Sequence, residues 1–168
     1  MYEAVLRAET RRRGDCIVRD LEEISGDVLD CAVQLHRDLG PGLLENVYEV
    51  ILAAMLREKG YLVETQRKLE IRYKQLVIPS VMRVDMLVEA AVLVEIKSLT
   101  QILPVHAKQV MTYLRLMDLS VGLLINFGGE TIKGNVRRIV NGYIPSASPR
   151  LRVNQTSHDR ENSAGAAA

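Results

Sequence analysis

Five consecutive apolar residues at positions 121–125 constrain the fold of this chain more than any other segment. The run is long enough for a β-strand and far too short to cross a membrane. Strands without alternating polar residues are typical of sheets that are covered on both faces. We therefore expect residues 121–127 to form a buried strand in a sheet flanked by helices.

Three segments predict the helices that cover this sheet. Over residues 21–39, apolar residues recur every three or four positions, which is the spacing of one helix face. A Gly-Pro-Gly turn ends this helix, and a second helix, over residues 43–59, is expected to pack against it as a hairpin. A third helix, over residues 104–118, begins with a proline, whose missing N–H group costs nothing in the first turn.

Between the second and third helices the apolar period changes to two, which indicates strands. Short strands are expected over residues 61–65, 69–73, 76–78, 82–88 and 92–97. An edge strand is expected over residues 131–140, beyond the buried strand. The predicted fold class is α/β, a mixed β-sheet flanked by helices and preceded by a helical hairpin.

The two ends of the chain lack an apolar period. Residues 1–20 contain three consecutive arginines, and we expect a flexible N-terminal arm there. Residues 144–168 are rich in Ser, Pro and Ala and are expected to form a disordered tail. One domain is therefore predicted, over residues 21–143.

The charge balance and the aromatic content exclude several classes of protein. The 22 Lys and Arg residues nearly balance the 21 Asp and Glu residues, so the net charge is +1. This balance excludes a polybasic coat protein and a strongly acidic disordered chain. Aromatic residues make up only 4%, which argues against a broad stacking platform for single-stranded nucleic acid. An enzyme that contacts nucleic acid through one local basic patch remains compatible with this composition.

The cysteines and the N-terminus predict a cytoplasmic protein that does not interact with membranes. Cys16 and Cys31 are too few for a disulfide framework and lack zinc-binding spacing, so a reducing compartment suits them. Cys31 is expected in the core. No apolar segment follows the N-terminal charges, so no signal peptide is expected.

Charged residues interrupt the two apolar strands at 82–88 and 92–97. Asp85 and Glu95 each lie five residues from Ala90, where a tight turn is expected, so the hairpin makes them cross-strand partners. Opposed side chains in an antiparallel pair have Cβ atoms roughly 4.5–5.5 Å apart. Lys97 lies two residues beyond Glu95 and therefore shares its face of the sheet.

Two acids this close in apolar surroundings predict a metal site. Burial and repulsion both favour the neutral form of one carboxyl group, whereas a divalent cation reverses this preference. Mg²⁺ suits one or two carboxylates and completes its shell with water and substrate phosphate. Lys97 could then hold the attacking water or stabilise charge on a phosphate. The alternative is an ion pair between Lys97 and Glu95 or Asp85 at a strand end, without a metal.

Other polar residues could join this site. Glu45 lies in the first turn of the second helix, where it could merely complement the helix dipole, and Tyr48 shares its face. Arg83 shares the face of Asp85 by alternation and could reach a phosphate. A polar stripe on the third helix, which could equally be a solvent-exposed face, consists of His106, Gln109 and Tyr113.

The segment Gly42-Leu-Leu-Glu-Asn-Val-Tyr48 matches the pattern Gly-x-x-Glu-x-x-Tyr, and the chain resembles the GxxExxY protein family. The resemblance covers roughly residues 24–143. It rests further on the stretches LHRDLGPGLLENVYE, MRVDMLVE, VEIKS, LPVHAKQVMTYLRL and VGLLINF. This family is placed in the PD-(D/E)xK nuclease superfamily, so the resemblance implies a restriction-endonuclease-like core.

The resemblance also implies roles for the charged residues. Asp85 and the Glu95-Ile96-Lys97 triplet match the D…ExK pattern, in which the acids hold the metal and the lysine is catalytic. Glu45 corresponds to the acid that a core helix contributes to the metal site. The carbonyl group of Ile96 is a further expected ligand.

Residues around this pattern are expected to position the substrate. Gln109 and Tyr113 resemble the QxxxY motif of the RecB-like and lambda-exonuclease-like branches. Val84 stands where the motif has its proline, a position without a chemical role. The residues expected to position the substrate are Arg83, His106, Gln109, Tyr113 and Tyr48.

We therefore expect a Mg²⁺-dependent nuclease, with Mn²⁺ able to substitute, that hydrolyses phosphodiester bonds in nucleic acid. DNA is the favoured substrate. The alternative is a module that keeps the nuclease fold without catalysis and binds nucleic acid or another protein. A homodimer or a larger nucleic-acid-processing partner is compatible with either hypothesis.

Overall fold

The computed structural model describes residues 19–142, without the side chains of residues 72, 73, 80 and 81. The predicted tail and all but the last two residues of the predicted arm lie outside this range, as does Cys16. The described chain folds into three helices and five strands. They are α1 (Leu21–Leu39), α2 (Glu45–Glu58), β1 (Val63–Tyr73), β2 (Leu76–Val88), β3 (Val92–Lys97), α3 (Pro104–Met117), β4 (Val121–Asn126) and β5 (Val136–Val140).

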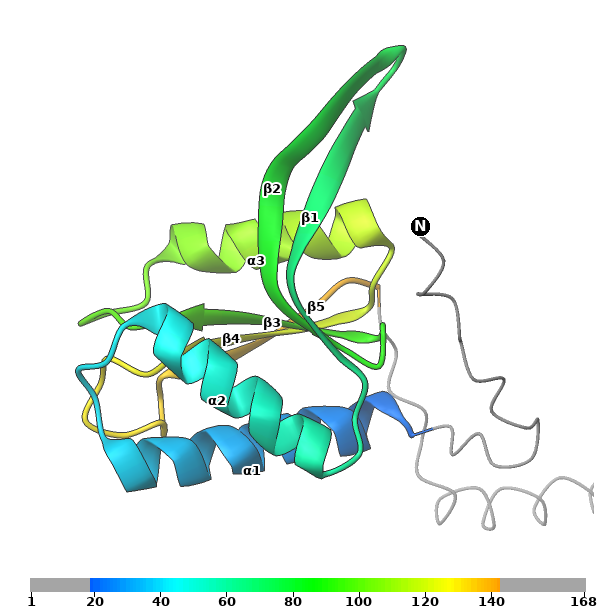
Figure 1. The fold of residues 1–168 in the computed structure, drawn as a ribbon. Helices are drawn as coiled ribbons and strands as arrows, with labels where there is room; N and C mark the ends of the chain where they lie inside the picture. Colours follow the sequence, from blue (N-terminus) through cyan, green and yellow to red (C-terminus); the bar gives the residue numbers. More distant parts are fainter. Residues whose placement is uncertain (1–18, 143–168) are drawn as a thin grey trace, which may run out of the picture.

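The strands form one mixed sheet in the order β1-β2-β3-β4-β5. β3 and β4 are parallel and are connected through α3, whereas the other neighbours are antiparallel. The helical pair α1 and α2 covers one face of the sheet and α3 lies on the other (Figure 1). The predicted mixed sheet, its flanking helices and the preceding helical hairpin are thereby confirmed.

The buried strand and the first helix agree closely with the prediction. Every residue of β4 is buried. On its α3 side, a Cβ atom added at Gly122 would lie 2.7 Å from Cγ1 of Val110, so glycine lets the helix approach closely. α1 spans the predicted residues, and the Asp20 side chain caps it by accepting a hydrogen bond from the Glu23 N–H at 2.7 Å. Cys31 is buried on its inner face, as expected.

The β1–β2 region differs from the prediction of four short strands. The two strands pair along almost their whole length, with one register shift between Leu69 and Ile71. They form a two-stranded ribbon that projects well beyond the helices (Figure 1). The prediction was wrong because polar residues were interpreted as breaks, whereas a ribbon exposed to solvent accepts polar side chains within its strands.

Two other boundaries moved for local reasons. α2 begins two residues after the predicted start because the turn continues to Leu44 in an extended conformation. The predicted edge strand is confined to Val136–Val140, and a loop occupies the preceding residues. No helix among residues 19–142 combines the length and apolar character needed to span a bilayer.

Candidate active site

The acidic residues lie where β2 leaves β3. The two strands pair from Val88–Val92 to Met86–Val94, which confirms the predicted register around a turn with positive φ at Ala90. One step further, this register brings Asp85 opposite Glu95. There the Ile96 N–H donates a hydrogen bond to Oδ2 of Asp85 at 2.8 Å. The Asp85 carboxylate thus accepts the hydrogen bond of a β3 N–H group in place of a backbone carbonyl, just beyond the last paired residues of β2 and β3.

Glu95 is a buried acid with one unpartnered oxygen. The residue is 2% exposed, and its Oε1 accepts a hydrogen bond from Nζ of Lys97 at 2.6 Å. Among the residues that the structure describes, Oε2 of Glu95 has no hydrogen-bond partner. A buried acceptor without a partner carries a desolvation penalty of about 1–3 kcal/mol. This oxygen therefore requires a further partner, such as a proton or a cation.

Burial and mutual repulsion perturb the titration of these groups. Burial, followed by the charge of Asp85, raises the pKa of Glu95 to about 7. The pKa of Asp85 is also raised, mainly by burial. Burial alone would lower the pKa of Lys97, but the hydrogen bond to Glu95 and the surrounding carboxylates together raise it. The site thus holds a permanent cation beside two acids that resist ionisation.

Glu45 lies near this pair without completing a three-acid metal site. Its Oε1 accepts a hydrogen bond from the Ser98 N–H at 3.1 Å, and Oγ of Ser98 donates to the Leu43 carbonyl at 2.7 Å. The charge of Glu45 still helps to raise the pKa values of Asp85 and Glu95. Within residues 19–142, no three Asp, Glu, His or Cys side chains are arranged to hold a metal.

The donor set of Asp85 and Glu95 fits a hard divalent cation. Both groups offer carboxylate oxygens, and one buried oxygen of Glu95 lacks a partner in the described part of the chain. Mg²⁺ is commonly bound through one or two carboxylates and keeps several of its waters. Two acids that repel each other in a buried place are tolerated once such a charge lies between them.

The structure assigns Tyr48 to the turn after α1 and thereby corrects its expected role in substrate positioning. The residue is 0% exposed, and its ring stacks on Phe127 with centroids 4.3 Å apart. Its hydroxyl donates to the Gly40 carbonyl at 2.7 Å and accepts from the Leu43 N–H at 3.2 Å. A side chain that is buried and hydrogen-bonded in this way cannot reach a substrate.

The predicted polar residues of α3 make local contacts. Nδ1 of His106 accepts a hydrogen bond from the Leu103 N–H at 3.1 Å and so caps the start of the helix. Nε2 of Gln109 donates to the hydroxyl of Tyr113 at 2.8 Å, and Tyr113 is 4% exposed. In the described part of the chain, no hydrogen bond joins these three residues to the acids. Arg83 is exposed, and its charge partly offsets the burial that raises the pKa of Asp85.

Glu49 is an acid of this region that the sequence analysis missed. It lies one helical turn after Glu45 and is 6% exposed. Its Oε2 accepts a hydrogen bond from the side chain of Gln66 in β1. Burial, followed by the charge of Asp85, raises the pKa of Glu49. Its spacing of four residues from Glu45 was the signal that could have identified it.

Asn126, at the end of β4, was also missed, because residues 121–127 were treated as an apolar strand. It is 0% exposed, and its side chain bonds both the N–H and the carbonyl group of Leu99 at 2.8 Å. It thereby holds the loop that follows Lys97. The lone amide within an apolar strand was the signal that could have revealed it.

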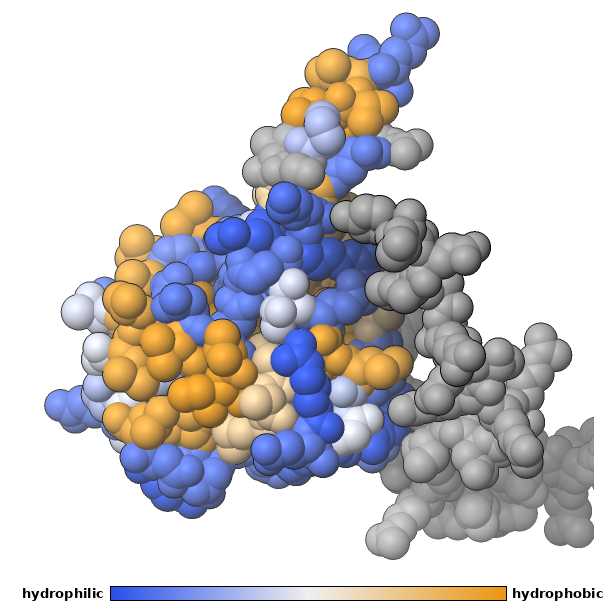
Figure 2. Space-filling model, in the orientation of Figure 1, coloured by the Kyte–Doolittle hydropathy of each residue, from blue (hydrophilic) through white to orange (hydrophobic). Residues whose placement is uncertain are grey.

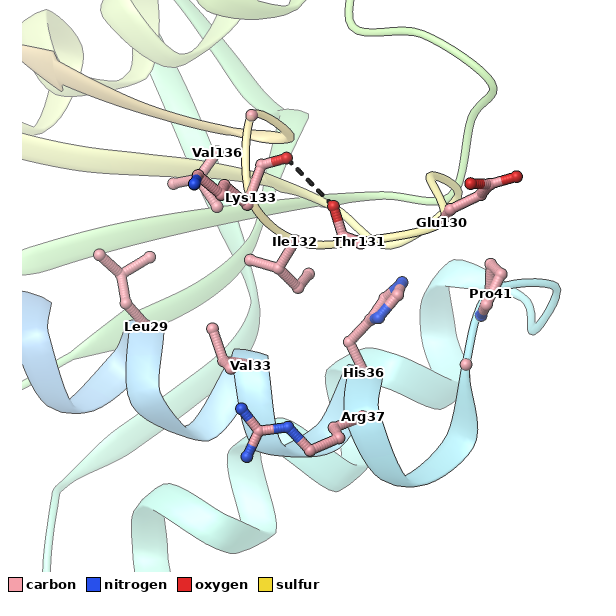
Figure 3. Close-up of a pocket in the computed structure, with 12 residues that line it drawn as sticks. Leu29, Val33, His36, Arg37, Pro41, Glu130, Thr131, Ile132, Lys133 and Val136 are labelled. Atoms are coloured by element: carbon pink, nitrogen blue, oxygen red, sulfur yellow. Dashed lines mark hydrogen bonds between the residues drawn. The ribbon is translucent and has the colours of Figure 1, made fainter.

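A pocket of about 660 Å³ lies elsewhere, between the C-terminal half of α1 and the loop before β5 (Figure 3). Leu29, Val33 and Ile132 line its apolar part, and Nε2 of His36 lies 2.8 Å from the Gly129 carbonyl oxygen at its inner wall. None of the acids described above lines it, so it is distinct from the candidate active site.

Comparison with known proteins is consistent with this arrangement. The model of a family described as PD-(D/E)XK nuclease superfamily matches residues 22–139, which is more than half of the 168 residues. No curated protein and no solved structure matches the chain significantly. The matched range begins in α1, ends in β5 and contains every acid of the candidate site. The chain belongs to the PD-(D/E)XK nuclease superfamily.

Proposed function

We propose that this protein is a divalent-metal-dependent nuclease that hydrolyses phosphodiester bonds in DNA. The observation that carries the proposal is Glu95, a buried acid beside Asp85 and Lys97 whose Oε2 lacks a partner among the described residues. Membership of a superfamily of nucleases supports the reaction class. Within that superfamily, we place the chain with the GxxExxY proteins, in the RecB-like branch.

In this proposal Asp85 and Glu95 hold the cation, together with the carbonyl group of Ile96. When bound, a divalent cation polarises the scissile phosphate and lowers the pKa of water. Glu45 remains tied to Ser98 and contributes negative potential rather than a direct ligand. Glu49 acts in the same way from the next turn of α2.

Lys97 acts as a cation in this proposal. Its pKa is raised, because its hydrogen bond to Glu95 and the nearby carboxylates outweigh its burial, so it stays protonated at neutral pH. A protonated amine cannot accept a proton from water. It can orient water through its N–H groups and stabilise the negative charge that develops on the phosphate.

Four further residues are proposed to position the substrate. Arg83 is exposed and offers a guanidinium group, which suits a phosphate. Gln109, which donates to Tyr113, is proposed to act with it as the QxxxY pair of the RecB-like branch. His106 lies one turn before Gln109, at the start of α3.

The proposal is tested by cleavage assays with Asp85→Asn, Glu95→Gln and Lys97→Ala. Single- and double-stranded DNA and RNA are incubated with Mg²⁺ or Mn²⁺. Each substitution should lower the rate about 10²–10³-fold, because Asp85 and Glu95 are proposed to hold the cation and Lys97 to stabilise the charge that develops on the phosphate. Glu58→Gln is the matched control, since Glu58 is an exposed acid of α2. It should cleave like the unmodified protein.

Undiminished cleavage by all three variants would contradict these assignments. If the unmodified protein cleaves no substrate but still binds nucleic acid in the presence of a chelator, the chain is a binding module with a nuclease fold. Thermal melting of each variant shows whether a lost rate reflects chemistry or unfolding.

A further inference from the structure

The function proposed above uses Asp85 and Arg83 of β2 but assigns no role to the rest of the projecting ribbon of β1 and β2. The ribbon, which projects beyond the helices (Figure 1), is continuous with the candidate site, because the pairing of β2 with β3 ends at Met86 and Asp85 is the next residue of β2. Leu76, the first residue of β2, precedes Asp85 by nine positions, which corresponds to about 30 Å at the rise of an extended strand. The ribbon is therefore a long arm that starts at the acids.

A pair of like charges lies directly across this ribbon. Lys68 of β1 is the register partner of Arg83 of β2, and both side chains are exposed. Like charges in directly opposed positions destabilise an antiparallel pair. Neither side chain makes a hydrogen bond or an ion pair with any residue in the 19–142 range. An anion bound between them would relieve this repulsion.

This basic pair shares a face of the ribbon with the acid at its base. Side chains alternate along a strand, so Arg83 and Asp85 lie on one face, about 7 Å apart along β2. The charge of Arg83 acts on Asp85 and also on Glu49 in α2. A molecule that contacts Lys68 and Arg83 would therefore extend directly to the acids.

Contacts to α2 fix the base of the ribbon. Gln66 has φ 55°, a left-handed conformation that non-glycine residues rarely adopt. Its side-chain amide donates to the buried carboxylate of Glu49. Beside it, Nη2 of Arg57 donates to the Val63 carbonyl at 2.8 Å. These two hydrogen bonds attach the base of the ribbon to α2, the helix that carries Glu45, and so fix the direction in which the ribbon projects from the sheet.

We propose that the face of the ribbon bearing Lys68 and Arg83 binds the sugar-phosphate backbone of double-stranded DNA and leads it to the acids. The inference rests on the proposed nuclease function and extends it to a substrate-binding surface. The basic pair complements the phosphates, of which each DNA strand carries one per about 3.4 Å of helix axis. A two-stranded ribbon also fits the dimensions of the major groove.

The shape and composition of the chain favour a duplex over a single strand. Single-strand binding relies on exposed aromatic rings. Among the side chains that the structure describes, all the Phe and Tyr rings are buried, namely those of Tyr48, Tyr61, Tyr113 and Phe127. Contacts to phosphates fix orientation and carry no base information. Binding through the ribbon is therefore independent of DNA sequence.

A second copy of the chain is the rival occupant of the ribbon. Leu76, Val77 and Ile78 are exposed close to its tip, where Figure 2 shows a group of hydrophobic side chains. An exposed apolar group of this kind suits a protein interface. It lies at the far end from the basic pair, so the two surfaces can be altered separately.

The test measures binding of the full chain to a fluorescent 20-base-pair DNA duplex by anisotropy, in EDTA and over a range of salt concentrations. Lys68→Ala combined with Arg83→Ala should weaken binding about tenfold and reduce the slope of log affinity against log salt by about 2. The control combines Arg115→Ala with Lys133→Ala, which removes two exposed charges outside the ribbon. It should leave the slope unchanged.

A second variant separates binding from folding. Lys68→Glu converts the repulsive pair into an opposed ion pair, so its melting temperature should not fall, while its DNA binding should weaken. Unchanged DNA binding by both ribbon variants would overturn the proposal. The proposal would also be overturned if the ribbon served only to form a dimer. In that case Leu76→Ser and Val77→Ser would dissociate the dimer, whereas substitutions of Lys68 and Arg83 would not change DNA binding.

Binding in EDTA does not require cleavage, so the two proposals fail separately. If the basic pair governs binding but the protein cleaves no substrate, only the nuclease proposal fails. If the protein cleaves DNA and the ribbon variants bind it normally, only the ribbon proposal fails.

Discussion

At the scale of single residues, Glu95 is the informative group. A carboxyl group that is 2% exposed and lies opposite another acid is a poor choice for stability. Lys97 neutralises one of its oxygens and leaves the other without a partner in the described structure. An arrangement of this kind is typical of functional sites, where local stability is lost in return for reactivity.

The titration of Glu95 makes stability depend on pH. Its pKa is raised from 4.5 to about 7, mainly by burial, so between these values the folded state binds more protons than the unfolded chain. The free energy of unfolding should therefore fall as the pH rises through this window, by about 3 kcal/mol in the absence of divalent metal. Urea unfolding of the protein and of Glu95→Gln, at pH 4.5 to 8 in EDTA, measures this contribution as a difference.

Glu58→Gln serves as the control for that comparison, since this exposed residue should not alter the slope. A difference between the protein and Glu95→Gln that stays constant from pH 4.5 to 8 would show that Glu95 is not perturbed.

At the scale of elements, the start of α2 is hydrogen-bonded both to the turn after α1 and to the residue that follows β3. Glu45 and Ser98 join the helix to the strand, and Tyr48 joins it to the turn. The Gly-x-x-Glu-x-x-Tyr pattern therefore has a structural explanation in this chain. Its tyrosine closes the turn, and its acid is positioned beside the metal-binding pair that we propose.

Tyr48→Phe tests this interpretation. Loss of the hydroxyl leaves the Gly40 carbonyl and the Leu43 N–H without their partner, which should destabilise the fold by about 1–3 kcal/mol. The cleavage rate of the folded protein should stay unchanged. Tyr61→Phe is a matched control, because the buried Tyr61 donates to Asp27 away from the acids. If Tyr48→Phe alone abolished cleavage at normal stability, Tyr48 would contact the substrate after all.

At the scale of the whole molecule, the sheet and the helical layers determine where the acids meet. β3 and β4 form the covered centre of the sheet, whereas β2 departs with β1 into the ribbon. Asp85 and Glu95 lie where β2 separates from β3. A ligand can approach the strands at this point, and the rest of the sheet holds the two acids in place. A ligand that binds here should stabilise the entire fold by mass action.

Divalent metal should therefore raise the melting temperature. At a concentration of about 100 times the dissociation constant, Mg²⁺ or Mn²⁺ should add about 2.7 kcal/mol to the free energy of unfolding. Scanning calorimetry at constant ionic strength measures the shift, and Glu95→Gln should abolish it. Equal stabilisation of this variant, or no stabilisation of the unmodified protein, would mean that the acid pair binds no metal.

The sequence predicted the features that depend on local periodicity. Alternation of side chains is strict, so the turn near Ala90 was sufficient to predict the register that pairs β2 with β3. The buried strand and α1 followed in the same way from their apolar spacing. These features require only neighbours along the chain.

Contacts between segments that are distant along the chain could not be predicted from the sequence. Glu49 of α2 accepts a hydrogen bond from Gln66 of the ribbon, and Glu45 accepts one from the Ser98 N–H after β3. Polar residues in β1 and β2 were interpreted as breaks because one sequence cannot show that two strands project into solvent. Whether an acid is buried or exposed depends on how such layers assemble.

The hydrogen bond from the Ile96 amide to Asp85 couples the acid pair to the backbone of β3. Any change in the charge of that carboxylate alters the shielding of this amide proton directly. The nitrogen and proton resonances of Ile96 thus offer an intrinsic spectroscopic probe of the site, readable without a substrate and without a substitution.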